Sequence, residues 1–316
     1  MGMTSANVIG LLHPGEMGAA VGQCLTGTGH TVLWASEGRG PDTAARARAA
    51  GLTDAGTAAE MAERADVIFS ICPPHAALDT AWAVQGFGGL YVDANAISPA
   101  TAREVALMVE EGGATYVDGG IIGLPPGTAG GTRLYLSGPQ ADPVRELFDS
   151  TVVDARVIRR GTWSASALKM AYAAWTKGTS ALLLAVRAMA RSEDVEEMLL
   201  AEWAISQPAL ADRSSRAALA ATTKGWRWVA EMEEIAATMA SVGLPDGFHQ
   251  AAAEIFRRSP RTDAAESRSA EVRPQDAQPG EPRSGNAHPG DHPPPVPDCG
   301  PIDMVLAALT GDVAAD

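Results

Sequence analysis

Short apolar runs alternate with helical patterns along the first half of the chain. The apolar runs predict buried strands at residues 7–12, 31–35, 66–72, 90–94, 115–118 and 132–137. Between them, the periodicity predicts helices at residues 16–26 and 99–111. Strands that alternate with helices at this spacing are typical of βαβ units, whose strands run parallel. We therefore predict an α/β fold with a mainly parallel sheet.

The pattern changes after about residue 160. Residues 164–191 contain no proline and a single glycine, Gly178, and they are rich in Ala, Leu and Met, which predicts one long helix. Further helical patterns cover residues 195–204, 214–242 and 249–257. An all-α C-terminal domain is therefore expected to follow the α/β domain.

The segment from residue 259 to residue 301 has a different composition. It holds ten of the 21 prolines and shows no periodic pattern, which is typical of a disordered insertion. A short apolar stretch at 302–309 predicts a last helix. The expected organisation is thus an α/β domain at 1–160, a helical domain at 161–258, an insertion at 259–301 and a C-terminal helix and tail at 302–316.

Charge and cysteine content narrow the range of functions. The net charge of −14 argues against a nucleic-acid-binding surface, and no apolar run is long enough to cross a membrane. The beginning of the chain lacks the basic segment of a secretion signal, so a cytoplasmic protein is expected. Three widely spaced cysteines do not form a disulfide framework, and the sparse histidines predict no metal site.

The turn after the first predicted strand carries the clearest chemical signal. Its sequence is His13-Pro14-Gly15-Glu16-Met17-Gly18, and a helix follows. Gly15 and Gly18 match the second and third glycines of the dinucleotide-binding pattern GxGxxG, while His13 stands in place of the first. The helix N-terminus would then offer its amides to a pyrophosphate. The alternative is a tight strand-to-helix turn in some other α/β protein.

Residues after the second predicted strand bear on the choice of cofactor. Ser36 and Arg39 suit the 2′-phosphate of NADP, whereas an acidic residue such as Glu37 suits the ribose diol of NAD. The pair Ser36 and Arg39 favours NADP(H) over NAD(H). Arg39 is otherwise interpreted as a solvated loop arginine. The first domain is therefore predicted to be a Rossmann domain that binds a nicotinamide dinucleotide.

Several segments, taken together, resemble the β-hydroxyacid dehydrogenases and 6-phosphogluconate dehydrogenase, a superfamily that also includes the imine reductases. Within this superfamily, the chain most resembles a branch that carries a C-terminal domain of unknown function, DUF1932. The resemblance covers about residues 7–257 and depends on residues 10–18, 72–74, 93–99, 161–169, 203–256.

This resemblance implies roles for individual residues. Asn95 matches a polar residue near substrate and nicotinamide, Cys72-Pro73 lies in the loop that flanks the nicotinamide, and Lys169 matches the catalytic lysine. The chain also differs from the family pattern. Ile122-Gly123-Leu124 stands where the family has Ser-Gly-Gly, and Tyr172 replaces an asparagine. These differences argue against a simple 3-hydroxy acid as the substrate.

The chemistry expected of Lys169 follows from its surroundings. Reduction of a carbonyl leaves an alkoxide that needs a proton, and a lysine in an apolar helical segment can supply one if it lines a cleft. The alternative is an exposed helical lysine. Tyr172, one turn later, is expected on the same face as a substrate contact or as an ordinary helix residue. Asn95 is otherwise an Asx turn, and Ser164 is expected to cap the helix.

The predicted function is therefore an NAD(P)-dependent dehydrogenase or reductase. It would act on a small polar hydroxy or carbonyl compound, with Lys169, Asn95 and Tyr172 as catalytic residues. An imine reductase with the same site is the first alternative, and a dinucleotide-binding sensor without catalysis is the second. A homodimer formed through the helical domain is expected, with no nucleic-acid or membrane partner.

Overall fold

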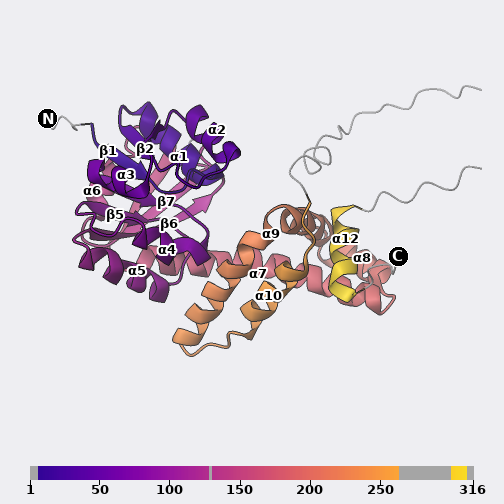
Figure 1. The fold of residues 1–316 in the computed structure, drawn as a ribbon. Coiled ribbons are helices and arrows are strands. Elements are labelled where there is room, and N and C mark those ends of the chain that lie inside the picture. Colours follow the sequence, from indigo (N-terminus) through magenta and orange to yellow (C-terminus); the bar gives the residue numbers. More distant parts are fainter. Residues whose placement is uncertain (1–5, 128–129, 263–299, 312–316) are drawn as a thin grey trace, which may run out of the picture. The chain divides into compact units, whose positions relative to one another are not determined.

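A computed structural model describes residues 6–127, 130–262 and 300–311. The chain divides into two compact units. The first comprises residues 1–176 and 230–250 and contains the sheet. The second comprises residues 177–229 and 251–316 and is helical in its described part. Figure 1 shows the sheet and the long helices.

The sheet of the first unit has eight strands in the order β3-β2-β1-β4-β5-β6-β7-β8. All neighbouring pairs are parallel except β6 and β7, which are antiparallel. The strands are β1 (Val8–Leu11), β2 (Thr31–Trp34), β3 (Thr53–Asp54), β4 (Val67–Ser70), β5 (Leu90–Asp93), β6 (Thr115–Gly123), β7 (Thr132–Ser137) and β8 (Val153–Ile158). The α/β class and the mainly parallel sheet predicted from the sequence are confirmed.

Helices cover both faces of this sheet. They are α1 (Glu16–Gly27), α2 (Pro41–Ala49), α3 (Ala58–Arg64), α4 (Ala77–Trp82), α5 (Pro99–Glu111) and α6 (Ala141–Glu146), with a 3₁₀ turn at Pro74–Ala76. Residues of α1, α2 and α6 pack into one core, and residues of α3, α4 and α5 pack into the other. Hydrophobic helices on both faces are what a parallel sheet requires, because neither of its faces meets water.

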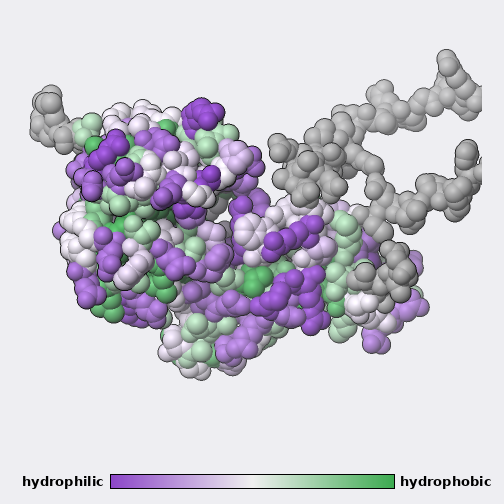
Figure 2. Space-filling model, in the orientation of Figure 1, coloured by the Kyte–Doolittle hydropathy of each residue, from purple (hydrophilic) through white to green (hydrophobic). Residues whose placement is uncertain are grey.

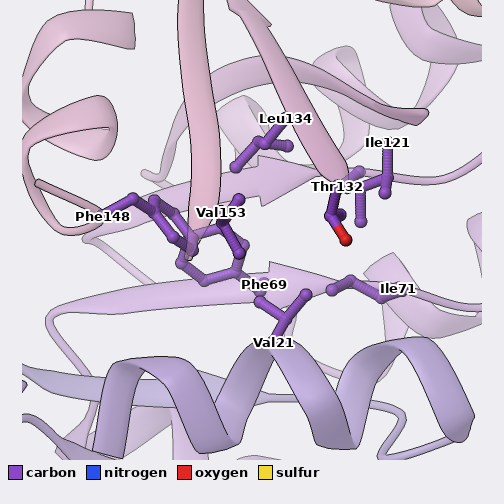
Figure 3. A pocket seen from close by; sticks show the side chains of 9 residues that line it. Val21, Phe69, Ile71, Ile121, Thr132, Leu134, Phe148 and Val153 are labelled. Carbon is purple, nitrogen blue, oxygen red and sulfur yellow. The ribbon is translucent and has the colours of Figure 1, made fainter. Parts of the chain in front are cut away.

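The core on the α1 side is closely packed (Figure 3). Val21 of α1 points toward Phe69 of β4 and toward Leu134 of β7. The gap that these apolar side chains leave has no room for a water molecule. This interior is therefore a packed core, and the functional site lies elsewhere.

Long helices follow the sheet. They are α7 (Ser164–Ser192), α8 (Glu196–Ser206), α9 (Leu210–Ser241), α10 (Gly247–Arg258) and, after the undescribed stretch, α12 (Pro301–Thr310). In the second unit, the buried Arg187 of α7 donates hydrogen bonds to Glu196 of α8 (2.9 Å) and to Ser214 of α9 (3.0 Å). Arg191 reaches Asp303 of α12 at 2.9 Å. Arginines of α7 thus join the helices of this unit.

The structure differs from the sequence-based expectation in several elements. β6 continues to Gly123, whereas the predicted strand ended at residue 118. The elements α2, β3, α3, α4, α6 and β8 were not predicted. The predicted last helix is present as α12. Residues 263–299, which make up most of the proline-rich segment, lie outside the described residues.

None of the helices in residues 6–127, 130–262 and 300–311 is long and apolar enough to cross a membrane.

Candidate active site

The strand order places the site beside the carboxyl ends of β1 and β4, two inner strands of the sheet. β1 and β4 are neighbours, and the chain leaves them toward opposite ends of the sheet, to β2 on one side and to β5 on the other. In open α/β sheets, ligands bind beside the carboxyl ends of the strands at such a reversal point. The residues after β1 and β4 include His13 to Gly18 and Cys72-Pro73. The structure therefore brings these two predicted segments to the same edge.

The turn between β1 and α1 depends on two glycines. Gly15 is the N-cap of α1 and has no side chain to bond the amides of the first turn, and a Cβ at this position would meet nothing within 4 Å. A Cβ on Gly18 would lie 2.2 Å from the carbonyl oxygen of His13. The helix therefore starts without a side-chain cap, and its backbone lies directly on the turn. Both features suit a dinucleotide pyrophosphate, which needs amide donors and close access to the backbone.

Arg39 extends from the loop after β2 to this turn. Its Nη1 donates to His13 Nε2 at 2.6 Å, and its Nη2 lies 3.4 Å from the carbonyl oxygen of Leu12. Partial burial, with the charge of Arg39, lowers the pKa of His13 to about 4. His13 is therefore neutral near pH 7 and accepts from the guanidinium. Ser36 precedes Arg39 in the same loop, and its carbonyl accepts from the amide of Arg39 at 3.0 Å.

A second arginine, which the sequence analysis missed, also reaches the turn. Arg46 of α2 has its Nε 3.4 Å from the carbonyl oxygen of Pro14 and its Nη2 3.0 Å from Thr43 Oγ1. Two guanidinium groups, from Arg39 and Arg46, thus contact the backbone of the glycine turn. Positive charge here complements the phosphates of a dinucleotide.

Asn95 joins the ends of β4 and β5. Its Oδ1 accepts from the amide of Cys72 at 2.6 Å, and its Nδ2 donates to Ser70 Oγ at 2.9 Å. The Asn95 side chain is buried, and both its oxygen and its nitrogen are hydrogen-bonded to other groups of the protein. Asn95 therefore fixes the start of the Cys72-Pro73 loop. Burial raises the pKa of the Cys72 thiol to about 11, which keeps it protonated and unreactive near pH 7.

The carboxylate of Asp93 lies beneath this loop. Asp93 is fully buried, its Oδ1 accepts from the amide of Asn95 at 2.9 Å, and its Oδ2 has no hydrogen-bond partner among the described residues. Burial raises the pKa of Asp93 to about 7, and the nearby charge of Asp118 adds to this effect. Asp93 is thus a buried acid that titrates near neutrality.

The start of α7 is held against the sheet by Asp118, the residue of β6 that pairs with Asp93. Its carboxylate accepts from the amides of Ala165 and Ser166 at 2.9 and 3.0 Å, from the hydroxyl of Ser166, and from Ser137 Oγ at 2.8 Å. The prediction that Ser164 caps this helix is wrong, because its hydroxyl donates to the carbonyl of Arg160. A carboxylate from a neighbouring strand provides the cap instead.

Lys169 lies one turn farther along α7. Its side chain is 15% exposed, its Nζ donates to the carbonyl oxygen of Ile121 at 3.0 Å, and the same nitrogen lies 3.6 Å from Oε1 of Glu231 on α9. Gly120 allows this placement, because a Cβ there would lie 2.9 Å from the carbonyl oxygen of Ala165 and 3.2 Å from Lys169 Cβ. The lysine is therefore held in place beside β6 and is not a solvated helical lysine.

Tyr172 is placed differently. It follows Lys169 by one turn of α7, but its side chain is 45% exposed, and its hydroxyl forms no hydrogen bond with the part of the chain that the structure describes. Ile122 and Leu124 stand where the family pattern has its substrate loop. Ile122 is buried, and Leu124 is 72% exposed. The structure thus keeps Lys169 in a defined environment and leaves Tyr172 facing outward.

Comparison with known proteins connects this geometry with a family. The profile of the NAD-binding domain of 6-phosphogluconate dehydrogenase matches residues 7–150, and the profile of the domain of unknown function DUF1932 matches residues 190–259. The chain thus combines an NAD-binding domain of the 6-phosphogluconate dehydrogenase type with a C-terminal DUF1932 domain. The glycine turn, Arg39 and Asn95 lie within the NAD-binding domain. Its helix N-terminus, which has no side-chain cap, and its flanking arginines fit the dinucleotide that this domain binds.

Curated relatives match only part of the chain. An uncharacterized protein of Methanothermus fervidus is 29% identical over 145 residues, which are 45% of this chain and 54% of the relative. A probable mitochondrial 3-hydroxyisobutyrate dehydrogenase of Dictyostelium discoideum is 28% identical over 145 residues, 44% of each chain. The match therefore spans about half the length of these relatives.

Solved structures match most of the chain. A conserved protein of unknown function, described as structurally similar to 3-hydroxyacid dehydrogenases, has a TM-score of 0.60 and 26% identity over 83% of this chain and 98% of its own. The 3-hydroxyisobutyrate dehydrogenase of Mycobacterium tuberculosis has a TM-score of 0.58 at 19% identity, over 80% of this chain and 94% of its own. An imine reductase of Myxococcus stipitatus has a TM-score of 0.52 at 20% identity, over 80% of this chain and 93% of its own. The last two likenesses concern the fold.

Three residues of the site were not found from the sequence: Arg46, Asp118 and Glu231. Two of them left a signal. Glu231 stands on the apolar face of α9 four residues before Ile235, and a charged residue in such a position needs a partner. Asp118 stood at the end of the predicted strand at 115–118, and the structure places it, fully buried, inside β6. Arg46 left no signal, because α2 itself was not predicted. Among the described residues, no group of three or more His, Cys, Asp or Glu side chains is arranged to hold a metal ion.

Proposed function

We propose that this chain is an NADP(H)-dependent oxidoreductase that acts on a small polar hydroxy or carbonyl compound, with Lys169 as general acid and base. The observation that carries this proposal is the environment of Lys169. It is mostly buried, bonded to the carbonyl of Ile121 and ion-paired with Glu231, in the same compact unit as the dinucleotide turn. A dinucleotide-binding sensor has no need of such a lysine.

Each group has a defined task in this reaction. The bound nicotinamide supplies or accepts the hydride. In reduction, the substrate oxygen gains negative charge, and Lys169 donates a proton from Nζ, so that the ammonium becomes a neutral amine and the product a hydroxyl group. In oxidation, the neutral amine takes that proton. Ile121 and Glu231 hold Nζ in place, while Asn95 fixes the Cys72-Pro73 loop.

The preference for NADP(H) is supported by charge at the glycine turn. Arg39 and Arg46 both contact this turn, and Ser36 lies in the loop of Arg39. Guanidinium groups bind phosphate by charge-assisted hydrogen bonds, which favours a cofactor with an additional 2′-phosphate. The competing group is Glu37, which is exposed in the same loop.

An imine reductase is the second candidate. Ile122 and Leu124 stand where the family pattern has the serine and last glycine of its substrate loop, so side chains there offer no polar contact to a carboxylate. The hydride step and the role of Lys169 would be unchanged, with nitrogen in place of oxygen as the proton acceptor. The imine reductase and reductive aminase structures support this candidate only through their fold.

The test is a screen followed by substitution of Lys169. NADPH oxidation is followed at about 340 nm against aldehydes, keto acids and cyclic imines, and hydroxy acids are tested in the other direction with NADP⁺. With the best substrate, Lys169→Ala is expected to lower turnover about 10²- to 10⁴-fold, because a general acid is lost. Lys169→Arg should not restore turnover, since arginine does not release its proton.

Matched measurements make this result specific. NADPH affinity, followed by quenching of protein fluorescence, should stay within about threefold in Lys169→Ala, because cofactor contacts with the glycine turn are unchanged. Lys224→Ala removes an exposed lysine of α9 and should keep the wild-type rate. A Lys169→Ala protein that retains more than about a tenth of the turnover would assign proton transfer to another group.

A further inference from the structure

Two carboxylates, one turn apart on α9, face the sheet-bearing part of the same compact unit. Glu234 accepts hydrogen bonds from the amide of Ser98 at 2.7 Å and from Thr101 Oγ1 at 2.8 Å, at the N-terminus of α5. Such bonds satisfy orphan donors of the helix end and favour a negative charge there. Glu234 thereby fixes the position of this part of α9 relative to α5.

Glu231 lies three residues before Glu234 on α9, and the same stretch of helix therefore positions it beside Lys169. Its side chain is 5% exposed, and its Oε1 lies 3.6 Å from Lys169 Nζ. A buried carboxylate is costly unless it has a partner of opposite charge, and the attraction between two charges is strong where water is excluded. The chain therefore provides its own counter-ion for the lysine of the active site.

This arrangement bears on the charge of the substrate. A substrate carboxylate close to Lys169 would meet an ammonium group that is already neutralised, together with the negative charge of Glu231. Like charges at such short range in a poorly hydrated site disfavour each other. Ile122 and Leu124 add no cationic or hydroxyl group that would compensate. A neutral or cationic substrate avoids this repulsion.

We infer that Glu231 determines substrate charge at this site, and that the enzyme takes carbonyl or imine compounds that carry no carboxylate. The inference rests on the proposed function, because it assumes that substrate reacts beside Lys169. Glu231 is assigned as a positioning and specificity residue that acts through Lys169, with no proton transfer of its own.

The experiment compares three four-carbon compounds with NADPH: butanal, which is neutral, 1-pyrroline, which is cationic when protonated, and succinic semialdehyde, which carries a carboxylate. In the wild type, kcat/KM for succinic semialdehyde should be at least about tenfold below that for butanal or 1-pyrroline. Glu231→Gln keeps the side-chain shape and removes the charge. It should raise the ratio of succinic semialdehyde to butanal by about tenfold or more.

Glu233→Gln is the matched control. It makes the same change of charge at an exposed position two residues away on α9, and its substrate ratio should equal that of the wild type. A wild type that prefers succinic semialdehyde, with a ratio that Glu231→Gln leaves unchanged, would overturn the inference. An equal rise of the ratio in both variants would overturn it as well, because the effect would then be long-range.

Binding of succinate separates this inference from the proposed function. If no compound is reduced, the proposed function fails, but titration of the NADPH-bound protein with succinate remains informative. Succinate should bind Glu231→Gln about tenfold or more tightly than it binds the wild type or Glu233→Gln. Equal binding to all three proteins would refute the charge role of Glu231. The same titration decides the matter if Glu231→Gln binds NADPH but has lost turnover.

Discussion

Asp93 connects the site with the pH dependence of stability. Its pKa is raised by burial from the usual 3.8 to about 7, so between these values the folded protein binds more protons than the unfolded chain. Stability is therefore expected to fall as pH rises through this window. In Asp93→Asn the amide oxygen can still accept from Asn95, and the buried charge is gone.

The expected outcome is that Asp93→Asn raises the unfolding temperature at about pH 8 by ~2–5 °C and changes it less at about pH 5. Thermal unfolding followed by circular dichroism at both values measures this. Asp79→Asn, an exposed position on α4, should show no such pH dependence. A stabilisation by Asp93→Asn that is larger at the lower pH would reverse the assigned sign.

Arg39 is expected to discriminate between the two nicotinamide cofactors. The wild type should bind NADPH more tightly than NADH, and Arg39→Gln should weaken NADPH binding about 10- to 100-fold while changing NADH binding about threefold or less. The reason is that the 2′-phosphate, present only in NADPH, would lose a charge-assisted hydrogen bond. Fluorescence titration with each cofactor provides the affinities.

Arg48→Gln serves as the control for Arg39, because Arg48 is an exposed arginine of the neighbouring α2 and should affect both cofactors equally. If wild-type NADH binding equals or exceeds NADPH binding, Glu37 becomes the residue to examine as a ligand of the ribose diol.

Single residues could be assigned from the sequence where the signal was local or came with the family resemblance. Gly15 and Gly18 are readable because the turn pattern lies within six residues. Glu231 was missed because its partner Lys169 is 62 residues away, and Arg46 because Pro14 is 32 residues away. Such contacts are created by the fold and have no period in the sequence.

At the scale of elements, the contact between α1 and the glycine turn is decisive. Gly18→Ala would place a methyl group 2.2 Å from the His13 carbonyl oxygen, so the turn would have to move. We expect a loss of stability of about 1–3 kcal/mol, together with weaker NADPH binding. Denaturant unfolding and fluorescence titration measure the two effects.

Gly27→Ala, at the end of the same helix, is the matched substitution. A Cβ there meets nothing within 4 Å, and the change should be neutral or stabilising by up to about 1 kcal/mol. NADPH affinity should stay as in the wild type. Equal behaviour of the two alanine variants would mean that the close approach at Gly18 does not control the turn.

Long helices with a clear apolar period were the elements located best from the sequence. α7 has 29 residues and α5 has 13, and both were located closely from their apolar pattern. β3 has two residues and α4 and α6 have six each, too few for a period to emerge. β6 was predicted too short because its second half contains Gly119 and Gly120, residues with low strand propensity. A Cβ on Gly120 would meet Ala165 and Lys169 of α7, and a Cβ on Gly119 would meet Asp93 and Ala94.

At the scale of the whole molecule, an exposed apolar stripe on α7 predicts self-association. Trp175, Leu182 and Met189 recur every seven residues and are 68%, 52% and 61% exposed. Figure 2 shows further hydrophobic residues among the hydrophilic ones on the visible helical surface. Apolar residues with a seven-residue repeat are typical of a face that pairs with another helix. A homodimer is therefore expected.

Light scattering coupled to gel filtration should give twice the 32.6 kDa of one chain at micromolar concentration. Leu182→Glu should shift the protein toward the monomer, because a buried charge would replace an apolar contact. Glu193→Gln, at the end of the same region, should not. A wild type that remains monomeric at these concentrations would contradict the assignment of this stripe.

The division of the chain into two compact units has a consequence for recombination between related genes. The chain passes between the two compact units after residues 176, 229 and 250, and the donors that hold Asp118, the amides of Ala165 and Ser166, belong to the unit of the sheet. A gene segment ending at residue 160 would leave a buried carboxylate without these donors. Recombination that exchanges C-terminal halves between relatives is therefore expected to yield viable hybrids when the crossover falls after residue 166, so that strand and helix start are inherited together.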